Sequence, residues 1–442
     1  MGWMPVFGTF SYGQRSKCAD LSELLHYFTR LYDWRRIVRR KIYPWIICLM
    51  STLLISCCMG ITNGTFSVFQ PYLVESGLTN TQASMILTVR NIFGCLAIAF
   101  SSQYYEHMGL RRGMTWNVCI GMIAFVIYSA ARIYPVFMIG AAMSGICYGW
   151  GGILPASMLI RRWFKKNRTL ALGISGSGSG VAMLILPVLL TSVIENKDMY
   201  AAFRLDALLM AITAVLLYLT IRESPEEAGL MPWGYEEENE KRKVVNEGAG
   251  LTSGEYAMLL VSMLFMGIST QPEVNHISVY FHELSFDPML APRTISVIGF
   301  FLIIGKCVYG YLVDIFQAFY VNLVYFLGII AGLFFLVLCK SGNTVFAYMA
   351  SVTLGYGTSL ATVGMMSIAG DLETPEKYMR TGKYFQLIYL GAVLVFSAVP
   401  GIVADAAGSY LPVYILAPCL MIIGMILVQT VYIRHGKGFI HK

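Results

Sequence analysis

The chain has 442 residues, of which 57% are hydrophobic and only 13% are charged, and its mean hydropathy is +0.63. In soluble domains about a quarter of the residues are charged, so this composition argues against a water-soluble protein. The apolar residues come in blocks of about 20 and not as short alternating strands, which favours membrane-spanning helices over a β-barrel. The net charge of +7 is spread over many short loops, and we therefore expect no nucleic-acid partner.

Apolar windows bounded by polar turns predict twelve membrane spans. Their approximate limits are 44–73, 81–104, 114–131, 134–160, 169–194, 203–221, 254–283, 291–313, 319–339, 344–369, 384–404 and 410–433. The expected fold class is an all-α membrane protein with twelve transmembrane helices in two pseudo-symmetric six-helix bundles. The corresponding domains are a basic amphipathic tail (1–42), an N-terminal bundle (43–221), a linker (222–252), a C-terminal bundle (253–434) and a second tail (435–442).

The Lys and Arg residues predict how these spans are oriented. Of the 32, 25 fall in the two tails, the linker and the loops on the same side, whereas five fall in the opposite loops. The remaining two, Arg90 and Lys306, lie within spans. Because cytoplasmic loops carry the excess of positive charge, we expect both termini in the cytoplasm and a multi-pass protein of the plasma membrane.

The N-terminal tail combines an apolar stripe with a basic cluster. Leu21, Leu25, Phe28 and Leu31 share one helical face, and several Arg residues follow them. This pattern predicts an amphipathic helix on the anionic inner leaflet. A partly disordered basic tail is the alternative.

The two halves of the chain echo each other at a nearly fixed offset, which indicates an internal repeat. Residues 149–151 (GWG) match residues 355–357 (GYG), 206 positions later. An acid also ends the second span of each half, with 208 positions between the two. The matched segments are Ser102-x-x-x-Glu106, followed by Gly109-x-Arg111-Arg112, and Gly310-x-x-x-Asp314.

Two six-span repeats with these acids resemble the major facilitator superfamily, whose loop motif there is G-x-x-x-D-R-x-G-x-R-R. This chain departs from the motif at Ser102, Glu106 and His107. An acid at a helix end can accept hydrogen bonds from a neighbouring helix N-terminus and attract nearby cations. We therefore expect a conformational latch, and the alternative is a charge that merely ends its helix. Its expected members are Glu106, Arg111, Arg112, Gly310 and Asp314.

A narrower resemblance is to the monocarboxylate and oxalate/formate porters. Residues 163–173 (WFKKNRTLALG) resemble the stretch [YW]-F-x-K-R-R-x-L-A-x-G of that group, with Asn167 as the departure. Residues 224–232 (SPEEAGLMP) resemble the start of the central loop in bacterial oxalate/formate-type porters. The D-G-[GS]-W-G-W opening of animal monocarboxylate carriers is missing, because residues 42–45 read IYPW. The chain therefore resembles the bacterial type more.

This resemblance implies a role for Lys306. Lys306-x-x-x-Gly310-x-x-x-Asp314 has the spacing of R-x-x-x-G-x-x-x-D, whose Arg binds the substrate carboxylate in that group. Independently, ionisable groups within spans are costly unless they are paired, hydrated or used. We expect Lys306 to bind a carboxylate, with snorkelling or structural pairing as the alternative. Arg90 is a second candidate for attracting an anion, or it pairs with a polar neighbour.

Residues 271–276 (QPEVNH) place Glu273 and His276 on adjacent turns of the seventh span. Pro272 kinks a helix and frees backbone carbonyls, and His titrates near neutrality. The pair is therefore a candidate for carrying a coupling proton, with structural hydrogen bonding as the alternative. Polar or aromatic residues in other spans are candidates for lining a central cavity, although core packing would also explain each of them. These residues are Asn63, Tyr148, Tyr356, Gln386 and Tyr389.

The expected function is secondary transport of small organic anions by alternating access, as an antiporter or a proton symporter. Its partners would be the anion, a proton or counter-anion and the lipid bilayer, and we expect a monomer with no cofactor and no metal. A drug-efflux antiporter of the same fold is the main alternative, although its usual G-x-x-x-G-P is interrupted here by Val181. An enzyme is disfavoured because HExxH, GxSxG and Walker motifs are missing, and a sensing receptor usually has a longer soluble domain.

Overall fold

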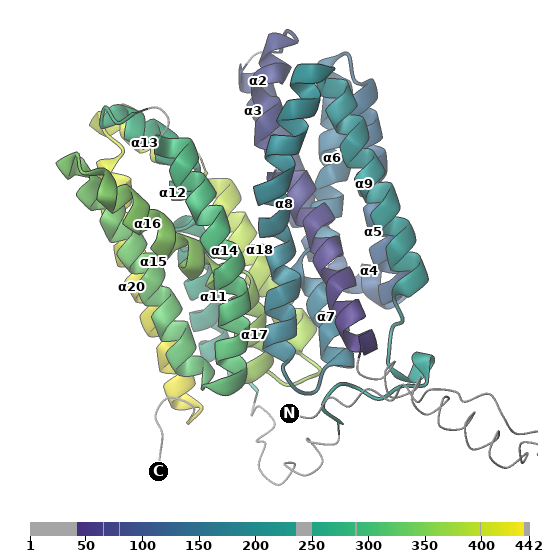
Figure 1. Cartoon of the computed structure of the whole chain (residues 1–442). Helices are drawn as coiled ribbons and strands as arrows, with labels where there is room; N and C mark the ends of the chain where they lie inside the picture. The colour runs from purple at the N-terminus through teal and green to yellow at the C-terminus, as the bar shows by residue number, and fades with distance from the viewer. Residues whose placement is uncertain are drawn as a thin grey trace, which may run out of the picture. The chain divides into compact units, whose positions relative to one another are not determined.

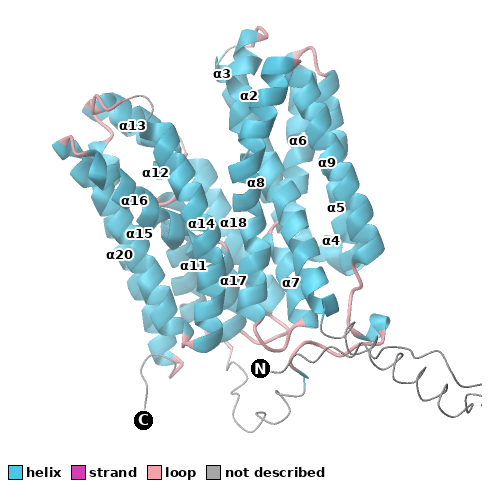
Figure 2. Cartoon of the chain, viewed as in Figure 1, coloured by secondary structure: helices cyan, strands magenta, loops and turns pink. Residues whose placement is uncertain are grey.

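The computed structural model describes residues 42–64, 66–78, 80–235, 250–287, 290–397 and 399–436. Residues 44–442 form one unit, and residues 1–43 form another. The described part of the chain is helical apart from turns, loops and one isolated parallel bridge between Phe164 and Trp233 (Figure 2). The predicted all-α fold is confirmed.

The described helices of the first half follow the six predicted spans. They are Ile42–Asn63, which overlaps the π-helix η1 (Ser56–Gly64), then α2 (Phe66–Glu75), α3 (Asn80–Ala99), α4 (Ser101–Met108), α5 (Leu110–Ala130), α6 (Tyr134–Trp150), α7 (Ile153–Trp163), α8 (Arg168–Asn196) and α9 (Met199–Thr220). A short 3-10 helix, η2 (Glu226–Ala228), follows in the linker.

The second half begins at a capping box, in which the Thr252 hydroxyl accepts from Glu255 N and the Glu255 carboxylate accepts from Thr252 N. Its described helices are α11 (Ser253–Ile268), α12 (Gln271–Asn275), α13 (Ile277–Glu283), α14 (Leu290–Ile315), α15 (Ala318–Leu338), η3 (Cys339–Ser341), α16 (Thr344–Gly357), η4 (Thr358–Ala361), α17 (Val363–Leu372), α18 (Tyr378–Phe396), α19 (Val399–Ala407) and α20 (Leu411–Arg434).

Among the described residues, eight helices are long and apolar enough to cross a membrane, and ten if each of two bent pairs is one span. The first pair bends by 59° between α3 and α4, and the second by 41° between η4 and α17. The other two predicted spans fall on α11–α13 and α18–α19, which are interrupted helices. Each of the twelve predicted spans therefore coincides with helix in the structure.

Helices pack mainly within their own half. In the first half α3 packs on α6 and α5 packs on α9, and in the second half α15 packs on α16 and α20. In Figure 1 the purple-to-teal helices α2–α9 group apart from the green-to-yellow helices α11–α20. Two helix pairs make the most extensive contacts between the groups, α8 with α14 and α3 with α18, and α17 and α18 also contact α7. A site between the halves can therefore be bordered by helices of both groups.

Glycines allow α8 and α14 to approach closely. A Cβ on Gly173 would lie 2.2 Å from the Lys306 carbonyl oxygen, and a Cβ on Gly310 would lie 2.2 Å from the Thr169 carbonyl oxygen. Any larger residue at either position would force the backbones apart. These contacts lie toward the end of the helices at which α8 begins and α14 ends, called the linker end below.

Two predicted features lie outside the described residues. The N-terminal amphipathic helix falls on residues 1–41, and the charged middle of the linker falls on residues 236–249. The domain limits proposed from the sequence remain predictions.

Candidate functional site

A small cavity of about 40 Å³ lies between the two halves. Its lining is mainly apolar, and the polar groups are the phenols of Tyr148 and Tyr389, the Gln386 amide and the Thr362 hydroxyl. The apolar lining comes from Met59, Ile98, Ile153, Ala361, Met365 and Leu390, with glycines at 149 and 152. The lining belongs to the first helix, α3, α6, α7, η4, α17 and α18. Three of the predicted cavity residues therefore meet at one place.

Tyr389 links this cavity to the seventh predicted span. Its hydroxyl lies 3.2 Å from the Thr270 hydroxyl, which donates to the Met266 carbonyl oxygen. Thr270 stands in the interruption between α11 and α12, one turn before Glu273. The cavity wall is thus connected to the helix that carries the predicted proton-coupling residues.

Arg90, on α3, is 5% exposed and is held within its own half. Its guanidinium donates to the Thr62 carbonyl oxygen at 2.9 Å and to the Asn63 and Asn91 side-chain oxygens at 2.8 and 3.0 Å. Thr62 and Asn63 belong to η1, and π-helical segments occur often at functional sites. The structure therefore brings together Arg90 and Asn63, which the sequence proposed separately.

Lys306, on α14, is 2% exposed and reaches across to the other half. Its Nζ donates to the Gly176 carbonyl oxygen at 3.1 Å and to the Ser179 hydroxyl at 2.9 Å, both on α8. A Cβ on Gly176 would lie 3.5 Å from Ile153, which lines the central cavity, and 3.7 Å from Lys306 Cδ. Lys306 therefore lies beside the cavity and not in its wall.

Both buried cations are satisfied by neutral oxygen atoms. Within the described residues, neither Arg90 nor Lys306 forms an ion pair with an acid, and snorkelling does not explain Lys306 because its amine is buried. The charge of Lys306 makes the surroundings of the central cavity attractive to an anion, because charges in a dry medium interact strongly. Arg90 and its hydrogen-bond partners do not line that cavity.

Glu273 and His276 lie in different surroundings. Glu273 is 2% exposed and lines a separate apolar cavity, and its main-chain oxygen accepts from the Tyr414 hydroxyl at 3.0 Å. The His276 ring lies 5.9 Å from the Tyr410 ring, and its main-chain N donates to the Glu273 carbonyl oxygen at 3.3 Å. The two residues thus meet through the backbone.

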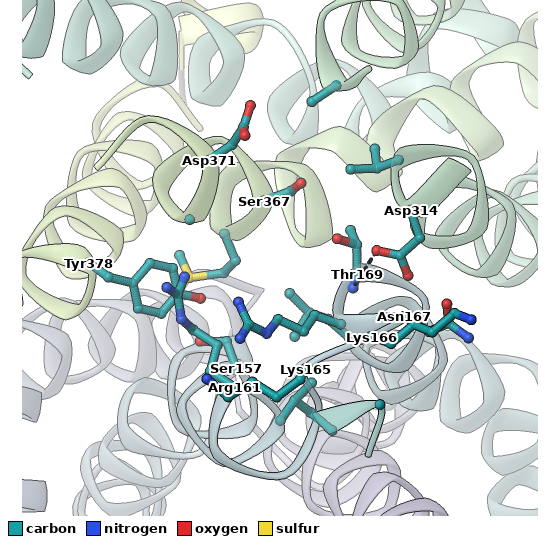
Figure 3. A pocket seen from close by; sticks show the side chains of 18 of the residues that line it. Ser157, Arg161, Lys165, Lys166, Asn167, Thr169, Asp314, Ser367, Asp371 and Tyr378 are labelled. Carbon is teal, nitrogen blue, oxygen red and sulfur yellow. Dashed lines mark hydrogen bonds between the residues drawn. The ribbon is translucent and has the colours of Figure 1, made fainter. Parts of the chain in front are cut away.

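Asp314 has the contacts expected of a latch. Its carboxylate accepts from the main-chain N of Thr169 at 3.1 Å (Figure 3). It also accepts from the main-chain N of Leu170 at 2.7 Å, so both donors belong to the first turn of α8. Free N–H groups and the helix dipole favour a negative charge at this position. Gly310, one turn earlier, allows the close approach to Thr169 described above.

The equivalent acid of the first half has no such contact. Glu106 is exposed, and no hydrogen bond or ion pair joins it to the described residues. Arg112 is also exposed, whereas Arg111 donates to the Tyr218 carbonyl oxygen at 3.0 and 2.8 Å and lies over the Tyr218 ring. The sequence therefore predicts two equivalent acids, but in this conformation only Asp314 forms hydrogen bonds with a neighbouring helix.

Glu223, which sequence reasoning did not single out, takes part in the contacts around Arg111. Its carboxylate accepts from Arg111 N at 3.3 Å and lies 3.6 Å from an Arg162 nitrogen. A Cβ on Gly109 would collide with it. Glu223 follows the sixth span directly, and an acid beside a cluster of cations was the only signal of this role.

Tyr356 faces away from the central cavity. Its hydroxyl donates to the Val324 carbonyl oxygen at 3.4 Å, and its ring packs edge-on against Tyr325 on α15. It belongs to none of the three cavities described. The repeat correctly related it to Trp150, whose ring stacks on Tyr104 in the first half. Both aromatic rings pack within their own half, so the alternative of core packing explains them.

A larger cavity of about 600 Å³ lies at the linker end (Figure 3). Four cations line it, together with Asp314 and Asp371 from the second half. The cations are Arg161, Lys165, Lys166 and Arg168. The Arg161 guanidinium lies 3.9 Å from the Tyr378 ring centroid, so a cation–π contact bridges α7 and α18. This cavity shares no lining residue with the central one.

Two helical groups with a cavity between them are the arrangement that many secondary transporters have. Residues 52–381 match the sequence profile of the Major Facilitator Superfamily. The chain belongs to this superfamily, as the internal repeat indicated, and it is a transporter and not an enzyme.

Relatives cover nearly the whole chain at low identity. An agnestins efflux protein of Paecilomyces divaricatus is 22% identical over 413 residues, which cover 90% of this chain and 89% of that protein. Monocarboxylate transporter 12 of Homo sapiens is 21% identical over 425 residues, which cover 87% of this chain and 80% of that protein. The fujikurins efflux protein of Gibberella fujikuroi is 22% identical over 396 residues, covering 86% of this chain and 80% of that protein.

Two solved structures have the same fold. The proton:xylose symporter XylE bound to 6-bromo-6-deoxy-D-glucose matches 88% of this chain and 95% of its own, with a TM-score of 0.69 and 14% identity. FucP in the outward conformation matches 87% of this chain and 98% of its own, with a TM-score of 0.65 and 14% identity. At this identity the likeness extends to the fold alone. It confirms the predicted fold class.

Proposed function

We propose that this transporter is a secondary carrier of small organic anions that works by alternating access. The observation that carries the proposal is the buried amine of Lys306, which lies beside the central cavity and is held only by neutral oxygens. Arg90, which is also buried and held by neutral oxygens, is the proposed second cation that attracts an anion. A buried charge without a counter-charge is costly. An anion in the cavity would lower that cost, whereas a cationic substrate would increase it.

The polar residues of the cavity wall fit an anion that also carries an apolar body. Tyr148, Gln386 and Tyr389 can each donate a hydrogen bond, and the remaining lining is mostly apolar. At the linker end, the cations around the larger cavity would raise the local concentration of anions. A monocarboxylate with a hydrocarbon or aromatic portion satisfies both features better than formate or oxalate, which have no apolar body.

Lys306 would connect substrate binding to the movement of the two halves. Its amine bridges α14 and α8, the helix pair with the most extensive contact between the halves. A substrate carboxylate that takes the amine away from the Gly176 and Ser179 oxygens would weaken this bridge. Binding and opening at the linker end would then be coupled, as alternating access requires.

Glu273, with His276 nearby, is the proposed carrier of a coupling proton. The connection from the cavity wall through Tyr389 and Thr270 leads to the helix interruption that precedes Glu273. A protonated and an ionised carboxyl would differ strongly in energy at this buried position. A counter-anion in place of the proton is the other mode of coupling.

Efflux of neutral small molecules is the second candidate function. The mostly apolar lining of the central cavity favours it, and two of the relatives above are named efflux proteins. The resemblance of residues 163–173 to monocarboxylate and oxalate/formate porters, together with monocarboxylate transporter 12 among the relatives, favours the anion carrier.

Uptake of labelled lactate, pyruvate, formate and oxalate into proteoliposomes, with and without a pH gradient, tests the proposal. Lys306→Met should weaken anion binding by about 10- to 150-fold, because it removes a charge-assisted contact worth ~1.5–3 kcal/mol. Lys306→Arg should retain activity and can favour carboxylates that accept two parallel hydrogen bonds.

Lys340→Met is the matched control, since Lys340 is exposed in η3 and its replacement should leave uptake unchanged. If Lys306→Met transports anions as the parent does, the anion assignment fails and neutral efflux becomes the better explanation.

The proposed location is the plasma membrane, with both termini in the cytoplasm. Cys18, which lies outside the described residues, should resist a membrane-impermeant thiol reagent in sealed cells when it is the only cysteine. A single cysteine at Lys340→Cys, on the opposite side, should react. The reverse pattern of labelling would invert the topology.

A further inference from the structure

A third cavity, of about 180 Å³, is lined by residues of the second half alone. It is formed by Ile268 and Glu273 at the interruption of α11, by residues of α18 and α19 such as Phe396 and Val403, and by α20. It shares no lining residue with the central cavity. Its surface is almost wholly hydrocarbon, and Glu273 contributes its only charged side chain.

One oxygen of the Glu273 carboxyl has no hydrogen-bond partner among the described residues. Glu273 is 2% exposed, and this oxygen is its Oε2. No Lys or Arg of the described chain forms an ion pair with it. The titratable groups in its neighbourhood are the phenols of Tyr389 and Tyr414 and the His276 imidazole. A buried polar atom left unpaired costs free energy, which a ligand with a hydrogen-bond donor would recover.

The wall of the cavity on α20 faces the hydrocarbon of the bilayer. Leu416 lines the cavity and is 57% exposed, and Val413 on the same helix is half-buried. A ligand can therefore enter from the lipid side between α19 and α20. The volume lies below the ~300 Å³ at which drug-sized pockets begin, so the ligand has the size of a small organic fragment.

We propose that this cavity binds a small lipophilic amine, whose nitrogen pairs with the Glu273 carboxyl and whose hydrocarbon portion contacts α19 and α20. The amine enters from the bilayer as the neutral base and meets the carboxyl in its neutral, protonated form. The O–H bond of the carboxyl breaks and an N–H bond forms, so the products are a carboxylate and an ammonium ion in contact. The proton stays inside the cavity, and no net charge crosses the hydrocarbon.

Charge complementarity selects an amine over other fragments. An apolar molecule would fill the volume but leave Oε2 unpaired, and an alcohol would form a neutral hydrogen bond only. A charge-assisted hydrogen bond is roughly twice as strong as a neutral one. An organic anion, the substrate class proposed above, would bring a negative charge into an apolar cavity whose lining, among the described residues, includes no cation, so this cavity and the central one would take ligands of opposite charge.

Binding of tritiated 2-phenylethylamine to the full-length carrier in lipid nanodiscs tests the proposal, with empty nanodiscs as the blank. The parent should bind the amine saturably, and 2-phenylethanol, which has a hydroxyl in place of the amine, should compete about tenfold or more weakly. Glu273→Gln should weaken amine binding by about 10- to 150-fold.

A second variant guards against a trivial loss of folding at Glu273. Val413→Phe places a larger ring at the rim of the cavity and keeps the carboxyl, so it should also abolish amine binding while anion uptake continues. Gln386→Leu alters the central cavity and should leave amine binding unchanged.

Three outcomes would overturn the proposal. Equal binding of the amine and the alcohol would show a site for neutral lipophiles. Loss of amine binding in Gln386→Leu but not in Val413→Phe would place the amine in the central cavity. Unchanged binding in Glu273→Gln would remove the carboxyl from recognition. Failure of the anion proposal is recognised separately, by normal anion transport in Lys306→Met.

Discussion

Lys306 and Asp314 of the second half reach across to the first half, whereas the buried cation Arg90 and the repeat-related acid Glu106 of the first half do not reach the second half. Lys306 and Asp314 both contact α8, through the Ser179 hydroxyl and the first turn of the helix, respectively. Arg90 is held by three oxygens of its own half, and Glu106 is exposed. A symmetric repeat has therefore produced an asymmetric set of contacts.

The difference shows which helix pair holds the two halves together at the linker end in this conformation. The α8–α14 pair combines glycines that allow close approach with a buried amine and a carboxylate at the helix N-terminus. The α3–α18 pair offers the amine of Lys383, which donates to the Ala99 carbonyl oxygen at 3.3 Å. Variants that weaken the α8–α14 pair should therefore change the conformational equilibrium more than variants that weaken the α3–α18 pair.

The largest effect is expected for Asp314→Asn. The substitution removes the charge that two main-chain N–H groups contact, and such bonds contribute ~1.5–3 kcal/mol. The closed state at the linker end should lose about 10- to 150-fold in population relative to the open state. Distances between spin labels on the two halves would measure this shift, and proteoliposome uptake should be slower with substrate affinity nearly unchanged. Normal uptake and an unchanged distance distribution would reduce Asp314 to a helix terminator.

Gly173→Ala should have the next largest effect. Its methyl group would lie 2.2 Å from the Lys306 carbonyl oxygen, so α8 and α14 must separate. Overpacking of this kind costs ~1–3 kcal/mol, and the same spin-label distances should report a larger open population. Gly299→Ala is the matched control, since nothing lies within 4 Å of a Cβ there. An identical response of both variants would show that helix propensity, and not contact, is responsible.

Ser179→Ala should have a smaller effect. It removes one acceptor of the Lys306 amine and leaves the Gly176 carbonyl oxygen in place. A hydrogen bond to a charged group contributes ~1.5–3 kcal/mol when it is lost from a buried site, but the freed amine remains available to a substrate carboxylate. We therefore expect tighter anion binding by a few-fold, roughly 1 kcal/mol, together with easier opening. The exposed Ser192→Ala, also on α8, serves as control, and weaker binding in Ser179→Ala would mean that Ser179 itself holds the substrate.

Glu106→Gln should have the smallest effect in the conformation described. The side chain is exposed and contacts none of the described residues, so the spin-label distances should remain unchanged. Uptake is the sharper measurement, because the carrier passes through both conformations in each cycle. Slowing equal to that of Asp314→Asn would show that the two acids act in turn, and the asymmetry would then belong to one conformation only.

The sequence was sufficient to predict the helices and their division into two repeats. Apolar blocks long enough to cross a bilayer must be helical, because every backbone group needs an internal partner there. The repeat also related Glu106 to Asp314, and residues 149–151 to 355–357. The sequence could not predict which of the two acids contacts a neighbouring helix, because the contacts of Asp314 depend on where the first turn of α8 lies in space.

The candidate site was predictable only in part, again because contacts depend on how the helices are placed in space. Tyr148, Gln386 and Tyr389 line the central cavity as expected, because polar side chains in an apolar block are seldom placed toward lipid. Tyr356 is likewise a polar aromatic residue in an apolar block, but its side chain faces α15. Adjacent residues of a helix point in very different directions, so a shift of one position decides which side a residue faces. Glu223 escaped notice because its role depends on contacts with two segments that are distant in the sequence, at Gly109–Arg111 and at Arg162.

The π-helical segment of the first helix has a consequence for residue-by-residue scans of this span. From Ser56 to Gly64 the main-chain hydrogen bonds join residues that are five positions apart, whereas in an α-helix they are four positions apart. Each turn of this segment therefore contains more residues than a turn of an α-helix. A solvent-accessibility scan with single cysteines should therefore follow a period of 3.6 before Ser56 and lose phase with it afterwards. A helical wheel drawn from Ile42 onward would assign Thr62 and Asn63 to the wrong face, although these two residues hold Arg90 in place.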